Sequence, residues 1–355
     1  MYGTERRQSS DTTSMTYLSQ THWRSRMTAA RGIPATDELD FFATLDRRLL
    51  HRRAISEVFL TSMVPTSRDG FLAGAQLPSS HTYFTDHQQE RRTLDPLLLL
   101  EACRQAETFA AHVLHEVPLD AKFVLRSWSW QQIGQAPELP AGPAELAIRA
   151  TTSNPQVRDG MVRGLDYDMD LWLGGAPLGS VQLRASYLPA AIYPGIRRHG
   201  RGSNPPLSDG AVVQPTTQAL APHQVGRLRP ENVVLAGLRE EETGTAADLL
   251  VPVANPSMFD HPLDHVPGMV AMEAARQLAL ATTNDRRGSL SRTQVTSLHG
   301  EFGRYLELDA PITLHAAPTI GQPELIQVSL RQQGVEAAAI RVGLSAADAV
   351  TGSRS

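Results

Sequence analysis

The sequence predicts an α+β fold built twice, in which each half is a long buried helix wrapped by an antiparallel sheet of about six strands. The first observation is a motif, E-A-x-R-Q, that begins at Glu101 and again at Glu273, 172 residues later. The second is that both copies lie in apolar stretches that open with a proline, and the third is that short β-rich runs flank each copy. A motif repeated at a fixed offset indicates an internal duplication.

Each motif predicts a helix that carries a polar patch in an apolar setting. In the first copy Asp95 has the place of an N-cap and Pro96 that of the first helical residue, where a missing N–H costs nothing. The leucine run that follows is apolar on every side, which is typical of a buried helix. Polar side chains then share one face of each helix: Glu101, Arg104 and Gln105 in the first copy, and Glu273, Arg276 and Gln277 in the second. Because a buried charge has to be paired or neutralised, these patches are candidate sites.

Short runs of β-forming residues predict the strands. They lie at 54–60, 72–77, 123–130, 145–150, 166–173 and 180–188 in the first half, and at 232–238, 248–253, 294–298, 312–315, 326–330 and 338–344 in the second. The pair Gly174-Gly175 predicts a hairpin turn. The expected organisation is a poorly ordered polar tail at 1–45, a first repeat at 46–190, a Pro/Gly-rich linker at 191–229, a second repeat at 230–345 and a tail at 346–355.

Composition excludes several classes of protein. The 355 residues carry a formal charge of −4, which argues against a nucleic-acid-binding surface. The single cysteine, Cys103, excludes an intramolecular disulfide and a cysteine-based zinc site. No signal peptide is visible and no apolar run approaches the roughly 18 residues that span a membrane, so we expect a cytoplasmic protein without membrane contact.

The segments that precede the two helices resemble those of the hot-dog dehydratases that act on acyl carrier protein. In these enzymes a His follows an aromatic pair and precedes a helix carboxylate by 14 positions, as His87 precedes Glu101. The second copy has the same character, with two residues fewer between His261 and Glu273. The dehydratases have no Arg-Gln after the carboxylate, so the match is incomplete.

A closer resemblance is to the A-factor synthase (AfsA) family of γ-butyrolactone hormone biosynthesis. Its pattern is similar to D-P-L-L-x-x-E-x-x-R-Q at 95–105, to F-D-H-P-x-D-H-x-P-G-M with E-A-A-R-Q at 259–277, and to F-G-R-Y-x-E-L-D at 302–309. The resemblance runs from about residue 50 to 345. It implies a double hot-dog fold, in which the two sheets join into one and the two helices lie side by side.

The resemblance also implies the reaction. A β-ketoacyl group, carried as a thioester on acyl carrier protein, would be joined to the hydroxyl of dihydroxyacetone phosphate, on the way to a γ-butyrolactone or furan signalling molecule that controls antibiotic production. No cofactor or metal is expected, and a homodimer is compatible with the family.

The residues can be matched to that chemistry. A His or a desolvated Glu can accept the hydroxyl proton, a buried helix N-terminus can stabilise the thioester oxyanion, and Arg can bind the phosphate. The candidate bases are Glu101, Glu273, His87, His261 and His265. The phosphate candidates are Arg104, Arg276 and Arg304, with Gln105 and Gln277 orienting their neighbours.

Other interpretations stay open. The Glu and Arg of each motif can pair within the helix as a structural ion pair, and Cys103 fits a small buried apolar residue better than a nucleophile. Asp260 and Asp264 beside two His residues could form a metal cluster, although the family pattern explains them better. The whole chain could instead be a dehydratase or thioesterase acting on carrier-bound acyl groups, or a ligand-binding sensor without activity.

The two copies are expected to pair crosswise, as in the dehydratases. His87 would then approach Glu273, while His261 or His265 would approach Glu101. Because the loops differ in length, we expect one dominant cleft, and the second loop favours the cleft around His261, His265 and Glu101.

Overall fold

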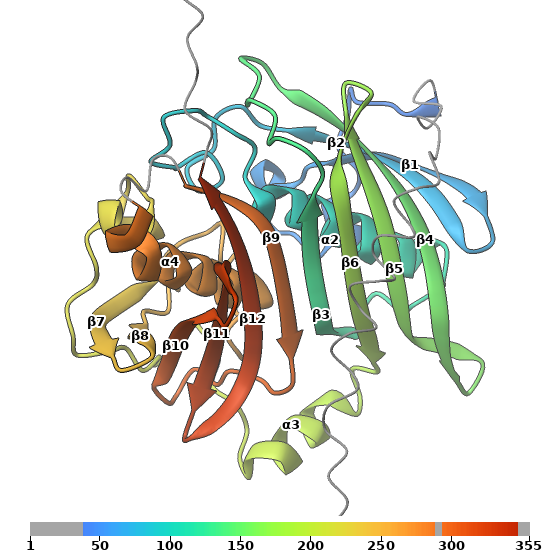
Figure 1. Ribbon diagram of the computed structural model, residues 1–355. Coiled ribbons are helices and arrows are strands. Elements are labelled where there is room, and N and C mark those ends of the chain that lie inside the picture. The colour runs from blue at the N-terminus through green and yellow to red at the C-terminus, as the bar shows by residue number, and fades with distance from the viewer. Residues whose placement is uncertain (1–37, 288–292, 347–355) are drawn as a thin grey trace, which may run out of the picture. The chain divides into compact units, whose positions relative to one another are not determined.

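Twelve strands form a single antiparallel sheet in the computed structural model, which describes residues 38–287 and 293–346 (Figure 1). The first half contributes β1 (Leu60–Ser67), β2 (Gly70–Leu77), β3 (Lys122–Gln132), β4 (Ala144–Arg158), β5 (Met161–Leu173) and β6 (Ala176–Leu188). The second half contributes β7 (Leu235–Glu241), β8 (Gly244–Leu249), β9 (Thr293–Phe302), β10 (Ile312–Thr319), β11 (Gln322–Gln332) and β12 (Val335–Ala346).

The strand order shows the duplication directly. It reads β1-β2-β4-β5-β6-β3-β9-β12-β11-β10-β8-β7, so the second half repeats the order of the first from the centre outwards. The two halves meet where β3 pairs with β9, over the register Ser127↔Glu301 to Gln131↔Ser297. The predicted double hot-dog fold with one continuous sheet is therefore confirmed.

Both motif helices pack against this sheet and against each other. They are α2 (Pro96–Val113) and α4 (Gly268–Arg287). Asp95 caps α2 as predicted, because its carboxylate accepts the N–H of Leu97 at 2.9 Å. The apolar residues of both helices belong to one hydrophobic core that runs through the two halves. Both motif glutamates face inward, with Glu101 1% and Glu273 0% exposed.

Two of the predicted strands begin later than the sequence indicates, for one shared reason. The stretch 54–60 contains the 3-10 helix η3 (Ile55–Glu57), and β1 starts only at Leu60. Here Gln105 occupies the backbone groups that a strand would use, since its Oε1 accepts the N–H of Phe59 and its Nε2 donates to the carbonyl of Glu57. A buried glutamine therefore determines where the strand starts.

The second half repeats this arrangement, and other boundaries also shift. Gln277 accepts the N–H of Val234 and donates to the carbonyl of Asn232, and β7 starts at Leu235 rather than within 232–238 as predicted. The strand predicted at 248–253 lies earlier, because β8 forms a hairpin with β7 and ends at Leu249. The Gly174-Gly175 turn is confirmed, with φ of +54° and +81°.

The predicted linker, 191–229, contains the helix α3 (Tyr193–Arg201) and the 3-10 helix η4 (Pro222–Val225). Figure 1 shows α3 at the end of the sheet where β3 begins. Before the first strand lies η2 (Arg47–Leu50), and before β7 lies η5 (Pro230–Asn232). The predicted tails fall largely outside the described residues. No helix in the described part of the chain is long and apolar enough to cross a membrane.

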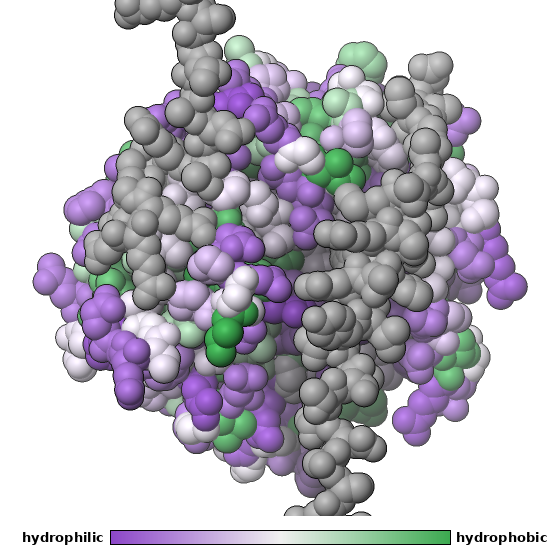
Figure 2. All heavy atoms as spheres, viewed as in Figure 1, coloured by the Kyte–Doolittle hydropathy of each residue, from purple (hydrophilic) through white to green (hydrophobic). Residues whose placement is uncertain are grey.

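Polar residues predominate on the surface visible in this view, with isolated apolar side chains between them (Figure 2). The outward-facing sides of the strands account for this pattern, since successive side chains of a strand alternate between the core and the solvent.

Candidate functional site

The α4 cluster is a buried group of charges around the second motif glutamate. Glu273 accepts hydrogen bonds from Arg276 and Gln277 of its own helix. It also accepts from Arg227 Nε at 2.9 Å and from the Tyr83 hydroxyl at 3.2 Å. Each oxygen of the carboxylate is thus shared by two donors, as a charge in an apolar interior requires.

The sequence did not point to Arg227 or Tyr83. Arg227 is 1% exposed, donates to the carbonyls of Tyr83 and Asp86, and lies 4.5 Å from the centroid of the Tyr83 ring. It comes from the predicted linker, 46 residues before its partner, so no local pattern reveals the pairing. The cluster fastens the linker and the first half to α4.

The α2 cluster repeats this arrangement around Glu101. Arg104 and Gln105 donate to Glu101 from the same helix, and Arg52 lies 2.6 Å from its Oε1, in the place that Arg227 holds in the other half. Although burial opposes ionisation, Arg104 and Arg52 lower the pKa of Glu101 to about 2. A carboxylate with this pKa is a weak proton acceptor near neutral pH, so the geometry favours a structural role for Glu101 over that of a base.

His87 lies next to the α4 cluster, on the side of the molecule where the crosswise pairing places it. Its Nε2 lies 2.9 Å from Asp95, and Asp95 in turn accepts from Arg276 at 3.2 Å. Arg276 and Asp95 therefore stand between His87 and Glu273. Burial lowers the pKa of His87, against the opposing effect of Asp95, and this favours the neutral ring.

His261 lies at the margin of the α2 cluster. Its neighbour Asp260 accepts the backbone N–H of Arg53 and Ala54, which ties the second loop to the segment that carries Arg52. The His261 ring is 35% exposed and lies 3.8 Å from Asp260. The structure therefore places His261 near the first helix, although no hydrogen bond joins it to Glu101 among the described residues.

Two pockets occupy equivalent places in the two halves. The α2 pocket is lined by the loop before α2, the end of β3 and the start of β9, and includes His87, Asp95 and Arg276. The α4 pocket is lined by the loop before α4, the end of β9 and the start of β3, and includes His265 and Arg304. The exchange of β3 for β9 between the pockets is what a pseudo-twofold axis through the β3–β9 pair requires.

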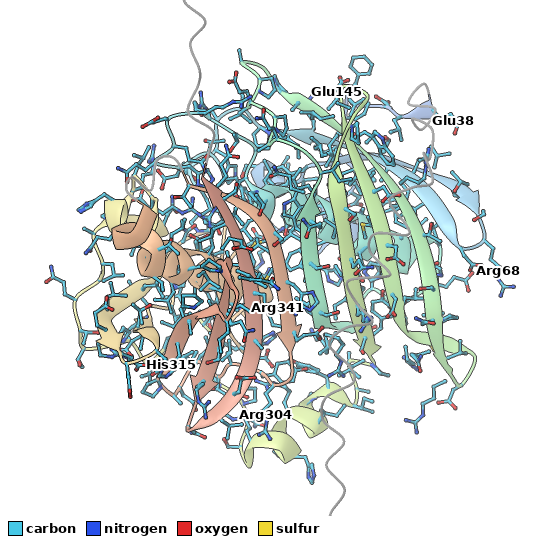
Figure 3. All side chains as sticks on the ribbon, viewed as in Figure 1. Glu38, Arg68, Glu145, Arg304, His315 and Arg341 are labelled. Atoms are coloured by element: carbon cyan, nitrogen blue, oxygen red, sulfur yellow. The ribbon has the colours of Figure 1, made fainter. Side chains whose placement is uncertain are left out.

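The α4 pocket combines a histidine with cationic and apolar walls. His265 Nδ1 lies 2.6 Å from the Asp264 carboxylate, which leaves Nε2 as the nitrogen that can accept a proton. Arg126 and Arg304 line the pocket, and neither has an ion-pair partner within the described ranges. Its apolar lining consists of Val124, Leu125, Val266, Ala271, Phe302 and Leu306. Figure 3 shows Arg304 at the end of the sheet where α3 lies.

The structure thus divides the predicted site residues into three groups. Arg276, Glu273 and Gln277 meet at the α4 cluster with His87 next to it, and Glu101, Arg104 and Gln105 meet at the α2 cluster with His261 at its margin. His265 and Arg304 line the α4 pocket. No hydrogen bond or ion pair joins His265 to Glu101 among the described residues; His265 instead contacts Asp264 and Tyr305, whose ring lies 4.9 Å from its own.

The two helices differ at their N-termini, where free backbone N–H groups can bind an oxyanion. At α2, Pro96 has no N–H and the Asp95 side chain takes that of Leu97. At α4, no acceptor within the described residues takes the N–H of Gly268 or Met269, and Gly268 lines the α4 pocket. Of the two helix ends, the α4 end therefore places an uncommitted N–H, that of Gly268, at a pocket.

Two other candidate chemistries can be placed. Cys103 is fully buried and burial raises the pKa of its thiol, so it behaves as a small apolar residue. In the described part of the chain no group of three or more His, Cys, Asp or Glu side chains is arranged to hold a metal ion. Asp260 and Asp264 instead accept hydrogen bonds from protein groups.

Comparison with known proteins gives matches over most of the chain. The model of the A-factor biosynthesis hotdog domain (AfsA) matches residues 34–189 and 209–352. The 2-oxo-3-(phosphooxy)propyl 3-oxoalkanoate synthase of Streptomyces virginiae is 33% identical over 276 residues, which cover 78% of this chain and 88% of that protein. The synthase of the same name from Streptomyces coelicolor is 29% identical, covering 76% and 80%. A 12:0-ACP thioesterase from Umbellularia californica matches with 11% identity and a TM-score of 0.45, covering 78% of this chain and 94% of that one.

Proposed function

The chain belongs to the A-factor biosynthesis hotdog-domain family, and from this premise we propose that it is an acyltransferase that joins a 3-oxoacyl group to the hydroxyl of dihydroxyacetone phosphate. The product is a 2-oxo-3-(phosphooxy)propyl 3-oxoalkanoate, the compound for which the Streptomyces synthases are named. The acyl donor in this proposal is a thioester on acyl carrier protein, and the product serves the biosynthesis of a γ-butyrolactone-type or furan signal.

The α4 pocket is the observation that carries this proposal. An alcohol that attacks a thioester needs a proton acceptor, a donor for the developing oxyanion, a cation for the phosphate and an apolar surface for the acyl chain. His265, the free N–H of Gly268, and Arg304 with its apolar neighbours line the pocket and supply these four requirements in one place, and the free N–H of Met269 follows that of Gly268 along the helix. The α2 pocket lacks free helix donors, and the charges that line it are already paired.

The reaction then needs no covalent enzyme intermediate. His265 Nε2 takes the proton of the substrate hydroxyl as its oxygen attacks the thioester carbon, a contribution of about 10²–10⁴ in rate. The carbonyl oxygen becomes an oxyanion beside the amides of Gly268 and Met269, at the positive end of α4. The C–S bond breaks as the carbonyl re-forms, and the thiolate takes the proton back from His265.

We assign the phosphate to Arg304, with Arg126 beside it. Their guanidinium charges are free to meet a phosphate, whereas Arg104 and Arg276 each lie within hydrogen-bond distance of a carboxylate. A dianion placed against an already neutralised pair gains little Coulomb energy and loses its hydration. In this assignment the two E-A-x-R-Q patches hold the fold together, and the catalytic roles expected of Glu101 and Glu273 pass to His265.

The test is an incubation of the protein with a 3-oxoacyl thioester, with and without dihydroxyacetone phosphate, followed by mass spectrometry. We expect the phosphorylated ester only when both substrates are present. Release of the free 3-oxo acid in both mixtures would indicate a thioesterase, and binding without turnover would indicate a sensor. A separate incubation with a 3-hydroxyacyl thioester tests for a dehydratase, which would release water from it.

A pair of histidine variants locates the base. His265→Gln should lower the rate by about 10²–10⁴. His315→Gln removes a half-buried histidine of β10, labelled in Figure 3, that lines neither pocket, and it serves as the matched control. Equal rates for the two variants would place the base elsewhere, with His87 the next candidate because its Nδ1 has no partner in the described part of the chain.

A further inference from the structure

The helix α3, from the predicted linker, is anchored to the residue that orients His265. The Tyr193 hydroxyl lies 3.0 Å from Asp264 Oδ1 and 2.9 Å from Oδ2, and Arg197 donates from Nε to Oδ2 at 3.2 Å. Arg197 also donates to the backbone carbonyl of Asp264 at 2.9 Å. The remaining bond of the same carboxylate goes to His265.

Arg197 is the buried centre of this anchor. It is 3% exposed, forms a bidentate pair with Glu307 at 2.9 and 2.8 Å, and its guanidinium carbon lies 3.9 Å from the centroid of the Tyr305 ring. Tyr305 in turn packs edge-on against His265. Arg197 therefore contacts both groups that flank the His265 ring, Asp264 and Tyr305. Through these two contacts it can influence both the orientation of the ring and the electrostatic field at it.

A neighbouring arginine provides the contrast. Arg201 lies on α3, as Arg197 does, and pairs with Glu307 at 2.7 Å and with Asp309. It contacts neither Asp264 nor His265 among the described residues. Docking of α3 as such and contact with the histidine–aspartate pair can therefore be separated by mutation.

We propose that Tyr193 and Arg197 are positioning residues for the acyl transfer, holding Asp264 so that it fixes the orientation and sets the basicity of His265. This inference rests on the proposed function only for the role of His265 as the base. The segment between the two repeats does not line the α4 pocket, but in this inference it supports the pocket through its contacts with Asp264.

Tyr193 and Arg197 affect the Asp264–His265 pair electrostatically as well as sterically. Burial opposes the charge of Asp264, but His265, Tyr193 and Arg197 together lower its pKa well below the usual range, so it is a carboxylate. The hydrogen bonds from Tyr193 and Arg197 partly neutralise the negative charge of the Asp264 carboxylate, and this weakens its attraction for a protonated His265 ring. Their removal leaves a stronger negative field at His265, which favours the imidazolium form of the ring. The charged and titratable groups around His265 are Asp264, Tyr305 and Arg304 from the second half, Arg126 from β3, Tyr193 and Arg197 from α3, and Glu307 behind Arg197.

The experiment measures the His265 ring itself. In protein labelled with ¹⁵N-histidine, the His265 resonances are assigned by their absence from His265→Gln among the 12 histidines of the chain. We expect Tyr193→Phe and Arg197→Met to raise the titration midpoint of His265 by about half a unit to one unit, and Arg201→Met to leave it unchanged. An unchanged midpoint in Tyr193→Phe would overturn the inference. If Arg197→Met does not fold, the result for Tyr193→Phe alone tests the inference.

Kinetics then separate the inference from the proposed function. If His265 is the base, the acid limb of kcat/KM moves to higher pH in step with the NMR midpoint, kcat of Tyr193→Phe falls about three- to tenfold and KM changes little. If the role of α3 were purely structural, the variants would lose activity but the acid limb of kcat/KM would stay at the same pH. Arg201→Met should show no more than such a loss of activity. A shifted midpoint with an unshifted limb would uphold the positioning of His265 and refute its role as the base.

Discussion

Glu107 is a buried acid that the reaction does not use, and its ionisation should make the stability of the protein depend on pH. It is 2% exposed in α2, accepts the Tyr187 hydroxyl at 2.8 Å and lies 3.0 Å from the Thr108 hydroxyl. Burial raises its pKa from 4.5 to about 7, against the opposing effect of these hydrogen bonds. The fold therefore favours the neutral acid.

The pKa shift of Glu107 determines the direction and the size of the change in unfolding free energy with pH. A carboxyl whose pKa is raised on folding contributes stability that is complete below pH 4.5 and is lost as the pH rises through about 7. A shift of this size corresponds to about 3 kcal/mol. Glu107→Gln keeps an acceptor for Tyr187 and a donor for Thr108 but cannot ionise, so the variant should gain about 3 kcal/mol relative to the wild type between pH 4.5 and 8.

The assay is urea unfolding at a series of pH values, with the unfolding free energy extrapolated to water. Glu145→Gln, at an exposed position of β4, is the matched control and should follow the wild type. If the difference between Glu107→Gln and the wild type stays constant across this pH range, Glu107 titrates normally and the argument from burial is wrong.

The remaining predictions concern the charged residues and the end of α4. Arg304→Met should raise KM for dihydroxyacetone phosphate at least about tenfold, or 1.4 kcal/mol, with Arg304→Lys between it and the wild type; an unchanged KM would move the phosphate site to Arg104 or Arg276. Arg227→Met should lower the unfolding free energy by about 3–5 kcal/mol, because it removes one of the two arginines that pair with the buried charge of Glu273 and leaves only Arg276. Arg52→Met should lower the unfolding free energy less, since Arg52 is 12% exposed and water can reach its partner Glu101 once it is removed. Equal losses of unfolding free energy in the two variants, measured by denaturant unfolding, would contradict this reasoning. Pro267→Asp should place a cap on α4 like that of Asp95 on α2, raising the melting temperature while lowering kcat about 10²-fold or more; full activity in the capped variant would exclude the oxyanion role of this helix end.

The fold followed from the sequence because its signals are local. The repeated motif, the proline-initiated apolar helices and the β-rich runs are each readable within about 20 residues, and the duplication then fixed the order of the parts. The strand starts at Leu60 and Leu235 were not readable in this way, because they depend on Gln105 and Gln277, which lie more than 40 residues further along the chain.

The residues of the proposed site could be predicted from the sequence only in part, for the same reason. The sequence named His265 and Arg304 but grouped His265 with Glu101, since the resemblance to dehydratases gave the pairing and the residues alone could not. Tyr193 and Arg197 went unnoticed because their partners lie 67 to 110 residues away, in segments whose mutual position only the folded chain defines.

The end of each helix gives a physical reason why the two copies diverged. Asp95 serves its own half as the N-cap of α2 and serves the other half as a partner of Arg276, so it contributes to two interactions that stabilise the fold. A capped N-terminus cannot also bind a developing oxyanion, because the same N–H groups would be required. The opposite choice, Pro267-Gly268 at α4, gives up the cap and leaves those groups exposed to a pocket. In the proposed mechanism, joining the halves in one chain therefore allows one helix end to stabilise the structure while the other binds the oxyanion.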